Sequence, residues 1–297
     1  MTGTSSPQYR SASGLPELSL RDASAPPFEA MPRPVIRVTV PEAFGRDHVE
    51  TWMPERLIIT IDGPAGTGKS TVARRLASRL GVDFLDTGAM YRAAALIAAE
   101  RGLSVSDAQS VVEAVRNVDM RFDWTTDPPD LLCDGRSVML RIRDEDVTSI
   151  VSPIAGIAEL RRLMVERQRA IASVHTRLVT EGRDQGSVVF PDADVKIFMY
   201  ASAEVRAKRR TDELRSRGIP ADEDKILSEI IERDRSDTTR AVGPLVCPDD
   251  AQRVDTSRLS IDQVVDELER RVRATVAADR LNAAGANLGS GPSAGTR

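Results

Sequence analysis

The chain has 297 residues and a formal net charge of -4, with charged residues making up 29% of it. This balance argues against broad attachment to nucleic acid or to an anionic membrane surface. The two cysteines, Cys133 and Cys247, lie far apart, and there are only two histidines, so we expect no disulfide framework, zinc cluster or histidine triad. Because no apolar run reaches the roughly 18 residues of a membrane span and no secretory signal is evident, the composition predicts a cytoplasmic protein.

The two ends of the chain differ in composition from its middle. Residues 1–54 are rich in Ser, Pro, Gly and Ala and show little periodicity, so we expect a disordered N-terminal extension. Within it, residues 35–40 alternate weakly and could add a strand to a sheet. Residues 282–297 are rich in Gly, Ala and Ser and predict a disordered tail. The folded domain is therefore expected at 55–281.

The strongest motif lies at 57–70. Leu57 to Ile61 is an apolar, β-branched run that predicts a buried parallel strand. Gly63 to Ser70 then matches the pattern G-x-x-x-x-G-K-[ST] of a phosphate-binding loop. Apolar residues follow at helical spacing, at Val72, Leu76 and Leu80. Strand, glycine loop and helix thus come in the order that this motif requires.

The chemistry of the loop explains its residue types. Glycines let backbone N–H groups converge on phosphate oxygens, and the helix N-terminus adds partial positive charge. Lys69 can reach the β- and γ-phosphates, and Ser70 can ligate Mg²⁺. We therefore predict that the chain binds Mg-ATP or Mg-GTP. The expected ATP-binding residues are Gly63, Pro64, Ala65, Gly66, Thr67, Gly68, Lys69, Ser70 and Thr71.

Strands and helices alternate along the rest of the chain. Further strands are predicted at about 82–87, 178–180, 195–200 and 253–256. Helices are predicted at about 93–101, 106–115, 154–173, 203–217, 222–236 and from 260 onward. This order predicts an α/β fold, a five-stranded parallel sheet wrapped by helices, with ligands at the carboxyl ends of the strands.

A segment of different character interrupts this alternation. Residues 118–124 alternate like a strand, and Asp134-Gly135 is a strong hairpin signal. We interpret residues 118–140 as a small antiparallel β subdomain inserted into the α/β domain.

Several classes of nucleotide-binding protein use such a loop. A regulatory GTPase needs an Asn-Lys-x-Asp base reader, and no asparagine of this chain precedes a lysine. A motor or AAA-type ATPase has a strand that ends in adjacent acids, which residues 178–181 resemble only loosely. The remaining class is a small-molecule kinase, whose second substrate faces the γ-phosphate.

Five stretches of the chain resemble the bacterial cytidylate (CMP) kinase family, a nucleoside monophosphate kinase branch of the P-loop kinases. They are IDGPAGTGKST, FLDTGAMYRA, SPIAGIAELRRLMVERQRA, EGRDQGSVVFPDADVKIFMYASAEVRAKRR and IIERDRSDTTRAVGPL. They cover most of 57–276 in the family's order and spacing. The resemblance also implies a monophosphate-binding insert at about 113–152 and a lid at about 206–240.

The resemblance implies an activity. The γ-phosphate of ATP would pass to CMP or dCMP, giving ADP and CDP or dCDP, with Mg²⁺ as cofactor. The enzyme would be a cytoplasmic transferase of pyrimidine nucleotide metabolism, a monomer that binds neither nucleic acid nor membrane. Alternatives are a kinase of UMP or another small acceptor, a regulator that binds CMP without turnover, and a scaffold that acts through its N-terminal extension.

The resemblance also implies roles for individual residues. The CMP-binding residues would be Thr87, Tyr91, Arg92, Ser152, Arg161, Arg183, Asp184, Arg233, Asp237 and Arg240. Ser152, Arg161 and Asp184 resemble the family's cytosine readers, because an arginine donor and an aspartate acceptor suit the edge of that base. The catalytic residues would be Lys69, Arg183, Arg206 and Arg210.

Some positions depart from the family pattern or carry no role in it. Thr87 replaces the usual serine and keeps the hydroxyl, whereas Gln185 replaces a usually apolar residue and affects local packing. Arg167 and Arg169 are expected on a solvated helix face. No general base is expected, because an acceptor phosphate with a second pKa of about 6 is already largely ionised at neutral pH.

Overall fold

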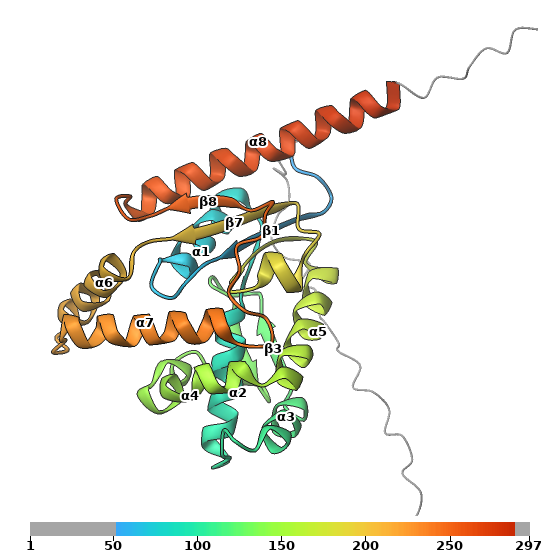
Figure 1. Cartoon of the computed structure of the whole chain (residues 1–297). Helices are drawn as coiled ribbons and strands as arrows, with labels where there is room; N and C mark the ends of the chain where they lie inside the picture. The colour runs from blue at the N-terminus through green and yellow to red at the C-terminus, as the bar shows by residue number, and fades with distance from the viewer. Residues whose placement is uncertain (1–51, 289–297) are drawn as a thin grey trace, which may run out of the picture. The chain divides into compact units, whose positions relative to one another are not determined.

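The computed structural model describes residues 52–288 (Figure 1). They all belong to one compact unit. The predicted strand at 35–40 and the tail beyond Leu288 also lie outside the described residues. Within 52–288, no helix is both long enough and apolar enough to cross a membrane.

A five-stranded parallel sheet forms the centre of the domain, as predicted. In spatial order it consists of β2 (Asp83–Asp86), β6 (Arg177–Gly182), β1 (Leu57–Asp62), β7 (Val195–Tyr200) and β8 (Gln252–Asp255). Every adjacent pair runs parallel. Each residue of the central strand β1 is buried. The phosphate-loop motif that follows β1 therefore starts at the middle of the sheet.

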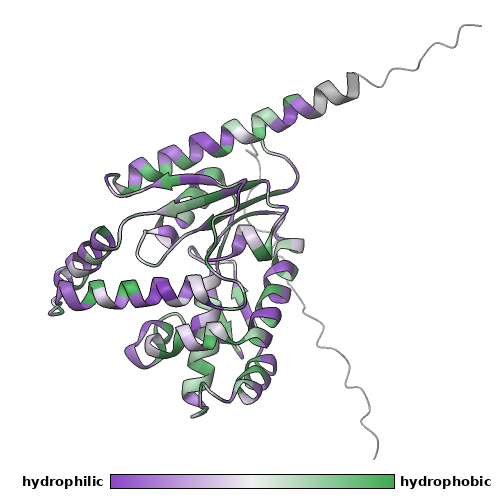
Figure 2. Ribbon diagram, in the orientation of Figure 1, coloured by the Kyte–Doolittle hydropathy of each residue, from purple (hydrophilic) through white to green (hydrophobic). Residues whose placement is uncertain are grey.

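Alternation along β1 divides the core into two clusters. Leu57, Ile59 and Ile61 pack against α1 (Lys69–Leu80) and α8 (Ile261–Leu288), whereas Ile58 belongs to the cluster on the opposite face. The buried stripe of α8 includes Val264, Val265, Leu268 and Val272. Polar and apolar residues alternate along this helix in Figure 2. Ile261, the first residue of α8, does not belong to this stripe and is exposed.

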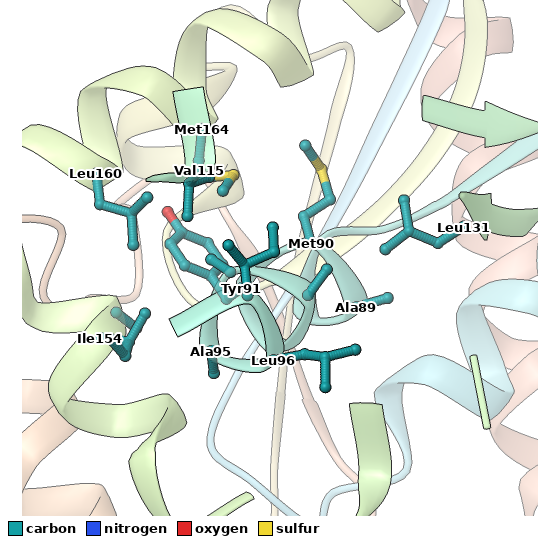
Figure 3. Close-up of a cluster of buried hydrophobic side chains, with 14 of the residues drawn as sticks. Ala89, Met90, Tyr91, Ala95, Leu96, Val115, Leu131, Ile154, Leu160 and Met164 are labelled. Atoms are coloured by element: carbon teal, nitrogen blue, oxygen red, sulfur yellow. The ribbon is translucent and has the colours of Figure 1, made fainter. Parts of the chain in front are cut away.

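The opposite face is covered by four helices. They are α2 (Thr87–Glu100), α3 (Ala108–Arg116), α4 (Glu145–Gly156) and α5 (Ala158–Val174). Alanines at 93, 94, 95 and 98 are almost fully buried in α2, so neighbouring elements can approach it closely. Figure 3 shows Met90 and Tyr91 of α2 with Leu160 and Met164 of α5 around them.

The predicted antiparallel insert is present as a separate three-stranded sheet. Its strands are β3 (Met120–Asp123), β4 (Asp130–Cys133) and β5 (Arg136–Ser137), in that order. Asp134 and Gly135 both have positive φ, 49° and 77°, as a tight hairpin requires. The returning strand is shorter than predicted, because a 3₁₀ turn, η1 (Arg141–Arg143), follows it.

The long helix predicted at 154–173 is in fact two helices. α4 ends at Gly156 and α5 begins at Ala158, with Ile157 in an extended conformation (φ -70°, ψ 113°) between them. The apolar spacing continues across the break, so periodicity alone did not reveal it.

The prediction that Arg167 lies on a solvated face is wrong, because its side chain is partly buried, whereas Arg169 is exposed as predicted. Arg167 donates hydrogen bonds to the carbonyls of Val115 and Val118 at the end of α3. Arg169 donates to the carbonyls of Val188 and Val189. Both guanidiniums therefore satisfy backbone acceptors where other elements end.

Two helices and a short turn complete the domain. α6 (Ala203–Ser216) and α7 (Glu223–Thr239) pack together in the predicted lid region through Ala207, Ile226 and Ile230. A single π-helical turn, η2 (Gln185–Val189), follows β6. The last helix, α8, continues past Asn282 to Leu288, farther than the composition predicted.

Candidate active site

The glycine loop joins β1 to α1 in a conformation that its sequence dictates. A Cβ at Gly63 would lie 2.0 Å from the carbonyl oxygen of Met199 on β7, so the chain has room only for glycine there. Gly68, the N-cap of α1, has a φ of 87°, which favours glycine. Thr67 closes the loop by donating from Oγ1 to the Pro64 carbonyl at 3.1 Å.

Lys69 lies buried beneath this loop. Its Nζ donates to the Pro64 carbonyl at 2.7 Å. Burial and the nearby positive charge of Arg183 lower the pKa of Lys69 to about 7, against the opposing charges of Glu181 and Asp62. An anionic ligand beside Lys69 would therefore raise the pKa of this lysine and favour its charged form.

Ser70, the predicted magnesium ligand, is tied to an acid at the end of the neighbouring strand. Its Oγ donates to Oε1 of Glu181 at 2.8 Å. Burial and the charge of Glu181 raise the pKa of Asp86, at the end of β2, to about 6, so these two carboxyls face each other. A hydroxyl and one or two carboxylates suit Mg²⁺, which prefers oxygen ligands and keeps phosphate and water among them. The residues present fit this ion.

Glu181 was not among the predicted site residues. The signal for it is present in the sequence, since the run Leu178-Val-Thr-Glu181 ends a predicted strand in an acid at the edge of the sheet where ligands are expected. The pairing of β6 beside β1, which brings Glu181 to Ser70, is a tertiary relationship.

A cavity beside the phosphate loop is lined by all ten residues that the resemblance assigned to CMP. They are Thr87, Tyr91, Arg92, Ser152, Arg161, Arg183, Asp184, Arg233, Asp237 and Arg240. They come from α2, α4, α5, the segment after β6, and α7 with its C-terminal end. The fold thus brings together residues separated by as many as 153 positions (240 − 87) in the sequence.

Arg161 and Asp184 form a buried ion pair at one side of this cavity. The side chains are 3% and 4% exposed, and Nη2 of Arg161 donates to Oδ2 of Asp184. Nη1 of Arg161 also donates to the Ala155 carbonyl at 3.1 Å, and the guanidinium lies 5.2 Å from the ring centre of Tyr91. Burial raises the pKa of Tyr91 to about 12, so its phenol is neutral. This side of the cavity therefore presents the N–H donors of Arg161 and the carboxylate acceptor of Asp184 next to the ring of Tyr91.

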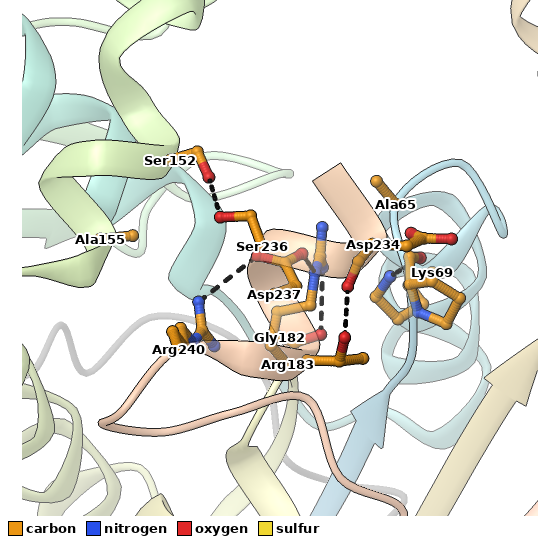
Figure 4. A network of polar contacts seen from close by, with 12 residues as sticks. Ala65, Lys69, Ser152, Ala155, Gly182, Arg183, Asp234, Ser236, Asp237 and Arg240 are labelled. Carbon is orange, nitrogen blue, oxygen red and sulfur yellow. Dashed lines mark hydrogen bonds and ion pairs between the residues drawn. The ribbon is translucent and has the colours of Figure 1, made fainter. Parts of the chain in front are cut away.

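Asp237 of α7 organises the opposite side. Nε of Arg183 donates to it at 2.8 Å, and Nη1 of Arg240 approaches it at 3.5 Å (Figure 4). Burial alone would raise the pKa of Asp237, but Arg183 and Arg240 hold it below its ordinary value. Ser152 reaches α7 as well, with its Oγ 3.3 Å from that of Ser236.

Several arginines crowd the part of the cavity nearest the phosphate loop. Burial and the neighbouring Arg183 lower the pKa of Arg233 to about 10. Burial and Arg143 likewise lower the pKa of Arg92. Like charges held this close favour an anionic ligand. Arg143, from η1, was not predicted, because no local pattern distinguishes it from other surface arginines.

The two predicted lid arginines do not line the cavity. Arg206 is buried and donates to the carbonyls of Ala201 and Ala65, each at 3.0 Å, and to both carboxylate oxygens of Asp234. Arg206 therefore connects α6 and α7 to the phosphate loop. Arg210 is exposed and pairs with Glu213 at 2.8 Å.

Gln185, the departure from the family pattern, is accommodated by a buried polar network. Its Oε1 accepts from Thr180 at 2.9 Å, and its Nε2 donates to Gln168 of α5 at 3.1 Å. The polar side chain is only 1% exposed but has partners at both ends.

Comparison with known proteins gives one consistent family. A profile of the cytidylate kinase family matches residues 59–274. A cytidylate kinase of Nocardia farcinica is 44% identical over 216 residues, which are 73% of this chain and 93% of that protein. One from Corynebacterium diphtheriae is 46% identical over 217 residues (73% and 94%). One from Pelotomaculum thermopropionicum is 47% identical over 218 residues (73% and 96%).

Proposed function

The chain belongs to the cytidylate kinase family, and we propose that it transfers the γ-phosphate of ATP to CMP or dCMP, giving ADP and CDP or dCDP. The observation that carries this proposal is the position of Arg183. This residue lines the cavity with the nine other residues assigned to CMP, and its charge also acts on Lys69 of the phosphate loop. The proposed site for the phosphoryl donor, ATP, and the proposed site for the acceptor, CMP, therefore share Arg183 at their boundary.

The residues divide the work between binding and alignment. The backbone of residues 63–68, with Lys69, Ser70 and Thr71, holds the ATP phosphates. Arg92, Arg183 and Arg233 hold the phosphate of the acceptor, whose oxygen is the nucleophile and needs no general base. Catalysis then has two parts. The enzyme holds the acceptor oxygen in line with the γ-phosphate, and it neutralises the negative charge on the oxygens of the transferred γ-phosphoryl group.

Ser70 and Glu181 are the residues that would hold Mg²⁺ together with ATP. When bound, the ion would neutralise part of the negative charge of the ATP phosphates. The hydrogen bond between Ser70 and Glu181 holds both side-chain oxygens together before a nucleotide binds, which lowers the entropic cost of assembling the site.

Cytosine recognition is assigned to Ser152, Arg161 and Asp184. Arg161 donates to the acceptors of the base and Asp184 accepts from its exocyclic amine, so a purine would leave buried polar groups without partners. Tyr91 and Thr87 form the wall beside them, and Asp237 and Arg240 face the sugar.

The lid arginines are proposed to act on the phosphates of ATP from two positions. Arg206 already touches the loop at Ala65, and Arg210 lies one helical turn farther along the exposed side of α6. We also propose that the enzyme is a cytoplasmic monomer of pyrimidine nucleotide metabolism.

An assay of ADP release with ATP, Mg²⁺ and each of CMP, dCMP, UMP, AMP and GMP tests the proposal. We expect strong turnover with CMP and dCMP and little with AMP or GMP. Turnover with UMP alone would retain the kinase but remove the roles of Ser152, Arg161 and Asp184. Binding of CMP without turnover of any acceptor would favour a regulator instead.

A further inference from the structure

The side chain of Asp62, the last residue of β1, connects the phosphate loop to the loop that carries Arg183 and Asp184. Alternation along β1 points Asp62 to the same face as Ile58 and Thr60, and it is 2% exposed. Its Oδ1 accepts from the backbone N–H of Gln185 at 2.9 Å, and its Oδ2 accepts from that of Gly186 at 2.7 Å. Both carboxylate oxygens are therefore bonded to consecutive residues of one loop.

That loop carries two residues of the acceptor cavity. Gln185 and Gly186 directly follow Arg183 and Asp184, which line the cavity. The ladder between β1 and β6 ends at the pair Asp62–Gly182, so beyond this point the strands no longer hold the loop. Beyond Gly182, the two hydrogen bonds of the Asp62 carboxylate hold the loop in place of hydrogen bonds between the strands.

Asp62 also directly precedes Gly63, the first residue of the phosphate loop. We propose that Asp62 is a positioning residue that holds the acceptor loop, residues 183–186, in register with the phosphate loop. This inference rests on the proposed function, since the bound acceptor is what Arg183 and Asp184 contact there. Asp62 itself is not expected to touch either substrate.

The charge state of Asp62 gives this arrangement a pH dependence. Burial raises the pKa of Asp62 to about 7; Asp184 raises it further, whereas the N–H groups of Gly186 and Gln185 and the charge of Lys69 oppose the shift. A protonated carboxyl presents an O–H where one of the two backbone N–H groups needs an acceptor. Both hydrogen bonds from Asp62 to the loop are therefore present above about pH 7, and one of them is lost as the pH falls below this value.

The test compares D62N with T60V at pH 8. Asparagine keeps one acceptor oxygen but turns an NH₂ toward a backbone N–H, so the loop loses one of its two bonds. Thr60 is the matched control: it is buried on the same strand face, and its Oγ1 has no hydrogen-bond partner among the described residues. We expect D62N to raise the KM for CMP about tenfold or more, with the Kd for ATP changed less than twofold. T60V should change neither.

Two outcomes would overturn the inference while wild-type turnover of CMP still supports the function. One is an unchanged KM for CMP in D62N. The other is an equal loss of ATP and CMP affinity, which would assign Asp62 to the phosphate loop alone. Absence of CMP turnover in the wild type would instead contradict the function itself.

A second measurement applies even if D62N does not fold. The inhibition constant of cytidine against CMP is measured in the wild type from pH 8.5 to pH 6. Cytidine has no phosphate to titrate, so any weakening in this range reports on the protein. We expect cytidine to bind more weakly below about pH 7, whereas a constant value across the range would overturn the inference.

Discussion

The hydroxyl of Ser70, in the first turn of α1, donates a hydrogen bond of 2.8 Å to the carboxylate of Glu181, near the end of β6. This contact joins the phosphate loop to the strand that leads into the acceptor loop. In the proposed mechanism it connects the sites for the two substrates and supplies a hydroxyl and a carboxylate that could hold Mg²⁺.

Replacement of this carboxylate tests the magnesium assignment. Glu181→Gln keeps the size of the side chain and an acceptor oxygen for Ser70 but removes the charge. We expect about tenfold more Mg²⁺ to be needed for half-maximal rate, because groups that orient a metal site affect its affinity on that scale. The measurement is a titration of Mg²⁺ at saturating ATP and CMP. An unchanged Mg²⁺ requirement would contradict the assignment.

Lys69 should take up a proton when ATP binds. Its pKa is lowered to about 7 in the protein alone, and the negative charge of a bound polyphosphate raises it again. At pH 8 the lysine therefore goes from mostly neutral to mostly charged. Calorimetry of ATP binding in two buffers of different ionisation enthalpy measures the uptake. Lys69→Met is the control, and an uptake that persists in this variant would place the proton elsewhere.

The same variant tests the catalytic role of Lys69. We expect Lys69→Met to lower kcat by about 10²-fold or more, the usual cost of removing one preorganised positive donor from the transition state. Full turnover in the variant would show that the arginines alone neutralise the transferred phosphoryl group.

Asp184→Ala should harm the use of CMP far more than the binding of ATP. Removing one partner of a buried charged pair leaves Arg161 unpaired, and we expect the KM for CMP to rise by about 10²-fold. Asp192→Asn is the control, since this exposed carboxylate belongs to a surface pair with Arg56. Equal losses for both substrates would mean that Asp184 maintains the fold and does not read the base.

Gln185→Met should destabilise the protein without changing which nucleotide it phosphorylates. Methionine leaves the buried hydroxyl of Thr180 and the side chain of Gln168 without partners, a cost of about 1–3 kcal/mol. We expect the thermal midpoint to fall by several degrees and the additional change Thr180→Val to restore part of it. A midpoint equal to that of the wild type would show that the network contributes nothing.

The sequence predicted the parts of the molecule that local patterns encode. Strand β1, the glycine loop and α1 follow from one run of residues, and the hairpin insert follows from Asp134-Gly135. The residues predicted to bind CMP line one cavity. The resemblance to the family predicted this set because it matches whole motifs in their order and spacing.

The remaining features depend on tertiary contacts that no local pattern encodes. Glu181 reaches Ser70 only because β6 pairs beside β1, and Arg143 comes within 3.9 Å of Asp86 only through the placement of η1. Arg206, expected to face phosphates, is engaged by Asp234, 28 positions later in the chain. The break at Ile157 is set by the packing of α4 and α5, since the apolar spacing runs through it.

The most direct test of the central claim follows the phosphoryl group itself. The wild-type enzyme is mixed with CMP and with ATP labelled at its γ-phosphate, and the products are separated. We predict that the label appears in CDP, in an amount equal to the ADP formed. Recovery of the label as inorganic phosphate, with CMP unchanged, would contradict transfer between the two sites.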